Sequence, residues 1–279
     1  MTILVTGATG NVGRLVVDEL LSIGATAVRA LTVSPKRANL PAGVEVAKGY
    51  LGKLETLPDA LDGVDTVYLA PVPETVKEFT ELAKKAGVKR IVVLSGEGAD
   101  EESRKDPSEW FYYGSEYAVE QGGFAWTHLR PGVFMNNTLD WADQIRADGR
   151  VRAPFGQALQ TPIDLRDIAA VAARALVDDA HDGKKYRLSG PAAITQVEQL
   201  HAIGEAIGRE LEWEELTPDQ AREYWGGQGL PEDVIEFLID VFEKTMRTPQ
   251  VPIQTVEELT GRPGCTYAQW AKENADKFT

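Results

Sequence analysis

The chain has 279 residues, of which 43% are hydrophobic and 26% are charged, an ordinary composition for a globular protein that can bury a sizeable core. Its formal net charge of -14 argues against extended contact with nucleic acid or with an anionic lipid surface, because both need a basic face on the protein. Small molecules or other proteins are therefore the expected partners.

Cysteine usage and the lengths of the apolar runs bear on where the protein works. Cys265 is the only cysteine, so no disulfide can form within the chain, which is typical of a reducing compartment. No signal sequence precedes the first apolar run, and no apolar stretch approaches the length needed to cross a membrane. These features predict a cytoplasmic protein without a membrane partner.

The chain opens with a glycine-rich turn. An apolar run over residues 3–5 precedes it and an amphipathic stretch over residues 14–23 follows it, so a strand is predicted to lead into a helix. Glycines at such a turn allow a tight bend, the close approach of a pyrophosphate, and close packing of the helix on its strand. The free N–H groups and the positive dipole end of the helix favour phosphate. The predicted cofactor contacts are Gly7, Thr9, Gly10, Asn11, Val12 and Gly13.

The segment after the second predicted strand favours NADP over NAD. NAD-binding domains place a carboxylate here to accept from the ribose hydroxyls, but no acidic residue occurs between Ala25 and Gly43. Ser34, Lys36 and Arg37 supply a hydroxyl and two cations where a 2′-phosphate would lie. The alternative is that the two cations are only solvated surface charges.

Strand-like apolar runs alternate with helix-like stretches, a pattern typical of a parallel sheet with helices on both faces. The further predicted strands are residues 26–31, 44–47, 66–69, 90–94, 126–129 and 185–188. Between the fourth and fifth strands, apolar residues at helical spacing predict a helix that Gly87 ends. Another helix is predicted over residues 168–177.

Small and polar residues stand at the carboxyl ends of these strands, where open parallel sheets bind ligands. Ala70 and Pro71 follow the fourth strand, Ser95 follows the fifth, and Pro131 and Gly132 follow the sixth. The nicotinamide end of the cofactor is predicted to lie among them. An aromatic cluster comes before the sixth strand, and its five rings within eight residues exceed one buried stripe, so some should line a pocket for a flat ligand. The cluster is Trp110, Phe111, Tyr112, Tyr113 and Tyr117.

From Thr195 onward the pattern changes to helices with short connections. Helix-starting signatures begin at Thr195, Thr217 and Thr255. Residues 234–242 are apolar nearly all round their helix, which predicts cover by the main domain, by a ligand, or by a second subunit of a homodimer. The segment Tyr-Trp-Gly-Gly at 224–227 predicts a hinge for a lid, although a glycine pair can also simply end a helix.

Metal and hydrolase chemistry fit the sequence poorly. His128, His181 and His201 are far apart and lack close-spaced partners, so no metal site is predicted, and His128 is interpreted as a core residue of the sixth strand. Ser95 lacks a glycine two residues earlier and is therefore not the nucleophile elbow of a hydrolase.

Several motifs in order resemble the NmrA-like group of atypical short-chain dehydrogenases, and the resemblance spans nearly the whole chain. The motifs are residues 6–13, 87–95 (GVKRIVVLS), 127–132 (THLRPG), 162–169 (PIDLRDIA), 259–264 (LTGRPG) and 267–270. The resemblance implies an NAD(P)-binding Rossmann domain with a small C-terminal substrate domain. It also implies either reductase activity on ketones or quinones or a non-catalytic role in sensing redox state.

Two positions depart from that pattern. Residues 49–51 read Gly-Tyr-Leu where the group often has Gly-Asp-Leu, so the tyrosine is left to stack on adenine or merely to pack. The wider superfamily uses Tyr-x-x-x-Lys, in which the lysine helps the tyrosine act as an acid, but here Glu116 follows Tyr112 and Tyr117 follows Tyr113 at that spacing. Without the cation a tyrosine remains a hydrogen-bond donor but is a poor proton source.

The sequence therefore predicts an α/β protein. A doubly wound parallel-sheet Rossmann domain covers residues 1–150, with 160–190 completing the sheet, and a smaller, mostly helical substrate-binding or lid part covers 191–279. The predicted activity is NADPH-dependent reduction of a ketone or quinone on an aromatic, polycyclic small molecule, as in a tailoring step of secondary metabolism. Ser95 and Tyr113 are predicted to orient the carbonyl while the substrate supplies the proton. The alternative is an NADP(H)-binding redox sensor or regulatory protein without catalysis.

Overall fold

The computed structural model describes the whole chain, Met1–Thr279, and the chain forms two compact units. The first unit comprises Met1–Gly132, Leu165–Leu188 and Thr255–Arg262, and the second comprises Val133–Asp164, Ser189–Gln254 and Pro263–Thr279. None of the helices is both long enough and apolar enough to cross a membrane.

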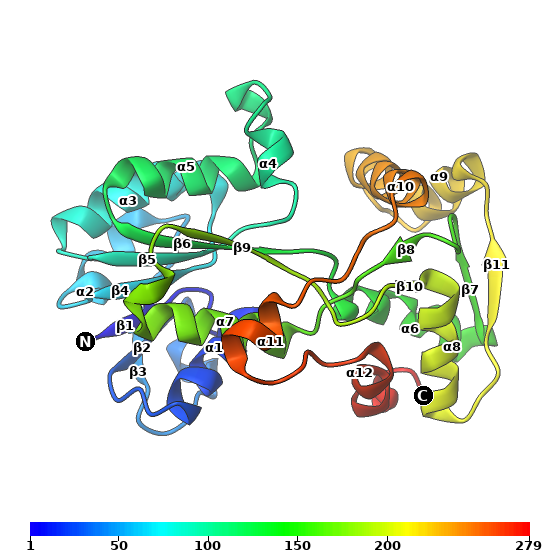
Figure 1. The fold of residues 1–279 in the computed structure, drawn as a ribbon, viewed down its shortest axis with the longest axis horizontal. Coiled ribbons are helices and arrows are strands. Elements are labelled where there is room, and N and C mark those ends of the chain that lie inside the picture. The colour runs from blue at the N-terminus through cyan, green and yellow to red at the C-terminus, as the bar shows by residue number, and fades with distance from the viewer. The chain divides into compact units, whose positions relative to one another are not determined.

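A seven-stranded parallel sheet forms the centre of the first unit (Figure 1), with the strand order β3-β2-β1-β4-β5-β6-β9. The strands are β1 (Ile3–Val5), β2 (Val28–Thr32), β3 (Glu45–Lys48), β4 (Thr66–Leu69), β5 (Arg90–Leu94), β6 (Ala125–Pro131) and β9 (Lys184–Leu188). The predicted strands are confirmed: β1, β4 and β5 agree residue for residue, and the others differ only at their ends.

Helices cover both faces of this sheet, which confirms the predicted doubly wound α/β fold. Figure 1 shows α3 and α5 on one face and α1 and α7 on the other. Alanines at 169, 170, 172 and 173 are buried on α7, because small side chains let this helix pack closely against α1 and the sheet. The helices of the unit are α1 (Asn11–Ser22), α2 (Pro58–Leu61), α3 (Val76–Lys85), α4 (Ala99–Glu102), α5 (Tyr112–Gly122), α7 (Leu165–Val177) and α11 (Thr255–Thr260).

The strand order reverses beside β1, which pairs with β2 on one side and with β4 on the other. The connections that leave β1 and β4 therefore cross to opposite faces of the sheet. In open parallel sheets this divergence leaves a crevice at the carboxyl ends of the two strands, where ligands bind. The glycine-rich turn and Ala70 stand at that edge of the first unit.

The second unit contains two small two-stranded sheets and five α-helices. β7 (Arg150–Ala153) pairs in parallel with β11 (Glu212–Glu215), and β8 (Leu159–Gln160) pairs antiparallel with β10 (Ile194–Thr195). The helices are α6 (Ala142–Asp148), α8 (Gln196–Ile207), α9 (Pro218–Gly227), α10 (Glu232–Arg247) and α12 (Tyr267–Glu273). Its apolar core includes Leu200, Trp270 and Phe278.

The boundary between the units differs from the division predicted near residues 150 and 191. Residues 133–164 belong to the second unit because β7 and β8 find their backbone partners in β11 and β10, far along the chain. Residues 255–262 return to the first unit, where α11 packs on α7 and β9. Strand pairing of this kind joins segments that are distant in sequence, so local sequence patterns do not predict it.

Helix capping follows the sequence closely at two of the three predicted starts. Thr195 and Thr217 each accept from the backbone three residues on and form complete capping boxes at the starts of α8 and α9. α11 begins at Thr255 itself, which therefore lies inside the helix. A further capping box at Thr266 starts α12.

Helix α10 is only partly covered. Ile235 and Ile239 are buried, but Val234 is 39% exposed and Phe237 is 58% exposed. The single chain therefore leaves part of this segment uncovered. Cover of the exposed residues by a ligand or by a second subunit stays a prediction.

Candidate functional site

Two glycines of the turn between β1 and α1 are required by the backbone, for different reasons. Gly7 has a φ of +60°, a conformation that favours glycine, and its carbonyl accepts from the Gly10 N–H at 2.8 Å. A Cβ at Gly13 would lie 2.3 Å from the Gly7 carbonyl oxygen, so only glycine lets α1 pack on this turn. Any other residue at 13 would deform the backbone that faces the edge of the sheet.

The start of α1 is left open for an anion. Its N-cap is Gly10, which has no side chain to cap the helix, and no acidic residue occurs in the first turn. Thr9, Gly10 and Asn11 are exposed, whereas Val12 and Gly13 are buried. These open N–H groups and the glycine backbone fit the diphosphate of a dinucleotide.

Thr6 ties this turn to the next strand, a role that the sequence reading did not assign. Its hydroxyl donates to the Tyr68 carbonyl at 3.0 Å and accepts from the Ala70 N–H at 2.9 Å. Ala70 and Pro71 are half-buried just beyond β4. The structure therefore brings these two predicted cofactor residues to the same edge as the glycine turn.

The predicted 2′-phosphate residues lie in the turn after β2. Lys36 and Arg37 are exposed in the short helical turn Pro35–Arg37, and neither makes an ion pair with an acidic side chain. Ser34 is half-buried, and its backbone N–H donates to the Thr32 hydroxyl at 3.2 Å. An additional cation reaches this loop, because Arg14 of α1 donates to the Asn39 carbonyl at 2.8 Å.

The carboxyl ends of β5 and β6 are joined by backbone hydrogen bonds. The Ser95 N–H donates to the Leu129 carbonyl at 2.7 Å, and the Glu97 N–H donates to the Pro131 carbonyl at 3.1 Å. Gly132 follows directly and donates to the Leu188 carbonyl of β9 at 3.0 Å. Ser95, Pro131 and Gly132 are thus neighbours, as the sheet order requires.

The structure places Tyr112, and not Tyr113, against the end of β5. A Cβ at Gly96 would lie 2.6 Å from the Tyr112 Cζ atom, so the tip of this ring rests on the Gly96 backbone. The Tyr113 ring instead packs edge-on against Trp110, with 4.8 Å between ring centroids. The rings of the aromatic cluster therefore contact one another as well as the sheet, and Phe111 remains exposed.

Glu102 holds the first turn of α5 beside this strand end. Its Oε2 atom accepts from the backbone N–H groups of Phe111, Tyr112 and Tyr113 at 3.1, 2.7 and 2.8 Å. Burial raises the pKa of Tyr112, and the charge of Glu102 raises it further. Tyr112 therefore stays protonated near neutral pH and can donate a hydrogen bond.

A buried ion pair lies behind Ser95. Arg130 of β6 donates from Nε and Nη2 to the two carboxylate oxygens of Glu116 at 2.8 and 2.7 Å, and from Nη1 to Asp100 at 2.6 Å. The Ser95 hydroxyl donates to Glu116 Oε1 at 2.6 Å. Burial works to lower the pKa of Arg130, but the bonds to Glu116 and Asp100 outweigh it and raise that pKa. Glu116 lies four residues after Tyr112 in the sequence.

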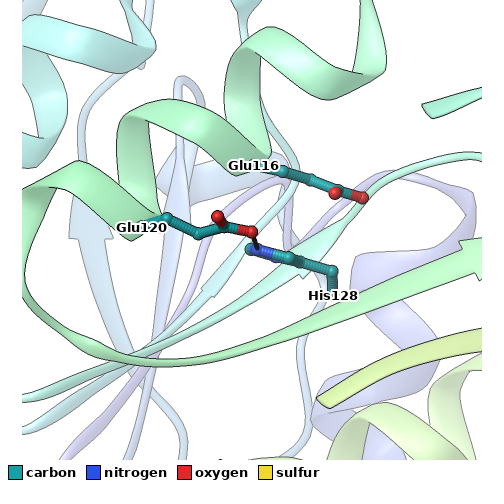
Figure 2. A group of neighbouring side chains, drawn as sticks. All are labelled: Glu116, Glu120 and His128. Atoms are coloured by element: carbon teal, nitrogen blue, oxygen red, sulfur yellow. Dashed lines mark hydrogen bonds and ion pairs between the residues drawn. The ribbon is translucent and has the colours of Figure 1, made fainter. Parts of the chain in front are cut away.

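His128 lies beside Glu116 and Glu120, as Figure 2 shows, and the two glutamates project from α5. His128 Nε2 is 3.1 Å from Glu120 Oε1, and the Trp126 ring stacks on the imidazole at 4.4 Å. Burial lowers the pKa of His128 to about 4, so the imidazole is neutral at pH 7. Its interpretation as a core residue is confirmed, and Glu120 is a spatial partner that the spacing of the histidines did not indicate.

The two glutamates and His128 offer three ligand atoms within 4.8 Å of one another, but protein cations already occupy their surroundings. Lys185 Nζ lies 2.9 Å from Glu120 Oε1 and 4.0 Å from Glu116 Oε2, and Arg130 neutralises Glu116. A metal ion would have to displace or repel these cations. The group is better described as an ion-pair network, and the absence of a metal site stays a prediction.

The second unit holds an apolar recess with a cavity volume of about 210 Å³. Most of its walls are small or aliphatic side chains. The lining residues are Met135, Pro162, Pro191, Ala192, Ile194, Glu198, Ala202, Thr266, Tyr267 and Ala268. Tyr267 turns its hydroxyl to Thr138 at 2.6 Å, which satisfies the buried phenol.

Comparison with known proteins agrees with the nucleotide-binding features of the glycine turn and of the strand ends. Residues 7–179 match a protein family described as NAD(P)H-binding. The chain belongs to this family, in its NmrA-like group of atypical short-chain dehydrogenases. The predicted family and the binding of a nicotinamide dinucleotide are thereby confirmed.

Two curated relatives cover 99% of this chain and 99% of their own length. A (4-alkanoyl-5-oxo-2,5-dihydrofuran-3-yl)methyl phosphate reductase of Streptomyces griseus is 39% identical, and an NAD(P)H azoreductase of Xenophilus azovorans is 36% identical. The chain is accordingly an oxidoreductase of the same family.

Solved structures share the fold over almost the entire chain. The NADPH-dependent quinone oxidoreductase QOR2 of Escherichia coli superposes with a TM-score of 0.82 at 26% identity, covering 98% of this chain and 99% of that chain. The triphenylmethane reductase of Citrobacter sp., complexed with NADP(H), superposes with a TM-score of 0.81 at 22% identity, covering 99% and 100%.

Proposed function

We propose that the protein is an NADPH-dependent reductase of a ketone or quinone carbonyl on an aromatic small molecule. The observation that carries the proposal is the meeting, at one edge of the sheet, of the open glycine turn with the ends of β4, β5 and β6. The cofactor supplies the hydride when bound, and the protein supplies binding and alignment.

The preference for the phosphorylated cofactor rests on charge. Lys36 and Arg37 are exposed cations without acidic partners, and Arg14 reaches the same loop. A 2′-phosphate would gain charge-assisted hydrogen bonds from them, whereas NAD would leave them in water. Gly7, Thr9, Gly10, Asn11, Val12 and Gly13 are proposed to hold the diphosphate, and Ala70, Pro71, Pro131 and Gly132 to flank the nicotinamide.

Tyr112 is the proposed donor to the substrate carbonyl, in place of Tyr113. Its ring rests on Gly96 at the strand end, and its raised pKa keeps the hydroxyl protonated. The same raised pKa makes it a weak acid, and α5 has no lysine to help it. We therefore propose that the proton comes from the substrate, from a phenol beside the ketone. Polycyclic hydroxyketones of secondary metabolism have this arrangement.

Loss of NADPH absorbance tests this function directly. The purified protein is offered quinones, hydroxylated polycyclic ketones and an azo dye, each with NADPH and with NADH. Turnover of a hydroxyketone or quinone with preference for NADPH supports the proposal. A Gly13→Val variant, which fills the turn, should lose turnover of all substrates. Reduction of the azo dye alone would contradict a carbonyl substrate.

A redox sensor is the second candidate, and one observation favours it. The polar groups behind the strand end are bonded to each other, since the Ser95 hydroxyl and Arg130 both bond to Glu116. A sensor would bind NADPH and NADP⁺ with different affinities and reduce none of the offered substrates. Titration of both cofactors beside the absorbance assay separates the two candidates.

A further inference from the structure

The only proton of the Ser95 hydroxyl is already used in a hydrogen bond within the protein. Arg130 forms two bonds to the Glu116 carboxylate, and a guanidinium is always protonated in proteins, so Glu116 is present as the ionised acceptor. An ionised carboxylate has no proton to give. The 2.6 Å bond between Ser95 Oγ and Glu116 Oε1 therefore runs from the serine to the glutamate.

This bond decides what Ser95 can offer to a ligand. A hydroxyl has one donor and two acceptor lone pairs, and the donor is used. No backbone or side-chain donor is bonded to the Ser95 oxygen, although Ser95 stands at the edge where β4, β5 and β6 end. Toward the ligand Ser95 is therefore an acceptor. A ketone or quinone oxygen is also an acceptor and gains nothing from it.

We propose that Ser95 accepts a hydrogen bond from the carboxamide N–H₂ group of the nicotinamide. Glu116 and Arg130 are positioning residues, because they keep the Ser95 hydroxyl proton directed at Glu116 and leave the oxygen lone pairs to accept. The carboxamide is the N–H donor at the reactive end of the cofactor, and the ends of parallel strands are where that end lies. This assignment replaces the predicted contact of Ser95 with the substrate carbonyl. It rests on the cofactor binding of the proposed function and is independent of the substrate.

The test compares two cofactors in a binding titration that needs no turnover. In the 3-acetylpyridine analogue of NADP⁺ a methyl group replaces the carboxamide nitrogen, so this donor is missing. Dissociation constants for NADP⁺ and the analogue are measured by calorimetry. The wild-type protein should prefer NADP⁺ by roughly two- to tenfold from this one bond, on top of any intrinsic difference between the compounds.

Variants isolate that contribution. Ser95→Ala should reduce the ratio of the two dissociation constants by the same roughly two- to tenfold factor. Ser95→Thr keeps the hydroxyl and should restore the wild-type ratio. Ser115→Ala is the matched control, because Ser115 is another buried serine of this unit and its hydroxyl has no hydrogen-bond partner. It should leave the ratio unchanged.

An equal ratio in wild type and Ser95→Ala would overturn the proposal, since the serine would then not contact the carboxamide. A ratio that falls equally in Ser115→Ala would also overturn it, because the effect would then not be specific to Ser95. If the protein reduces no substrate but keeps the Ser95-dependent ratio, the reductase function fails while this inference stands.

Discussion

The carboxylate of Glu116 and the guanidinium of Arg130 form a two-bond ion pair within the first unit, where their side chains are 0% and 4% exposed. Glu116 lies four residues after Tyr112, the spacing at which the wider superfamily has a lysine. The cation of this site therefore comes from β6, and a carboxylate already neutralises it.

Removing the cation should destabilise the protein. Arg130→Met leaves Glu116 buried without its partner, which costs about 3–5 kcal/mol. Lys89→Met is the control, since Lys89 pairs with Asp65 at 2.9 Å but its side chain is 78% exposed, and such pairs contribute about 0–1 kcal/mol. Urea denaturation measures both. Equal losses would contradict the importance of burial.

Cofactor choice should depend on the turn after β2. The wild-type protein should bind NADP(H) more tightly than NAD(H), and Lys36→Ala with Arg37→Ala should weaken NADP(H) by about tenfold to a hundredfold each while leaving NAD(H) nearly unchanged. Titration by tryptophan fluorescence gives the affinities, with Lys77→Ala on the exposed side of α3 as control. Equal affinity of the wild type for the two cofactors would rule out a phosphate site here.

The source of the proton can be traced with a pair of substrates. Tyr112→Phe should reduce the rate by about tenfold, the effect of losing one neutral hydrogen bond, and should retain turnover of a ketone with an adjacent phenol. Tyr113→Phe should have a smaller effect, because its ring packs on Trp110. Methylating the phenol should slow the wild-type enzyme strongly. Normal reduction of the methylated substrate, with no activity in Tyr112→Phe, would show that the protein supplies the proton.

His128 should make stability depend on pH. Its folded-state pKa is lowered by burial to about 4, below the ordinary value of 6.5, so the unfolded chain takes up this proton first as pH falls. The contribution of neutral His128 to the free energy of unfolding is fully present above pH 6.5. It is lost progressively toward pH 4, by up to about 3 kcal/mol. His128→Gln should flatten the dependence between pH 7 and pH 5 in urea denaturation. An unchanged slope in the variant would mean that other groups cause it.

The predicted lid remains open to test in the second unit. Gly226 and Gly227 end α9, and α10 begins at Glu232, so a short connection separates the two helices. Hydrogen exchange over residues 224–238 should slow when substrate and cofactor are added together. Protection elsewhere in the chain without a change here would count against a lid.

Local features of the sequence were sufficient to predict most of the fold of the first unit. The apolar runs of β4 and β5 were located residue for residue, because buried parallel strands are continuous apolar segments bounded by polar ones. The glycine turn was equally readable, since Gly7 and Gly13 are required by backbone geometry within a few residues. Such features depend on near neighbours in the chain.

The site chemistry was decided only by the tertiary structure. Ser95, Glu116 and Arg130 come from β5, α5 and β6, and each reads separately as a polar residue in an ordinary element. Their hydrogen bonds determine whether the Ser95 hydroxyl donates to a ligand or accepts from it. The direction of that hydrogen bond cannot be predicted from the spacing of residues in the sequence. The choice between Tyr112 and Tyr113 likewise depended on which ring reaches Gly96. Local sequence was sufficient to predict the strand–turn–helix that is proposed to bind the dinucleotide, because its steric demands involve near neighbours in the chain. The side-chain partners across elements depend instead on how the sheet and α5 pack.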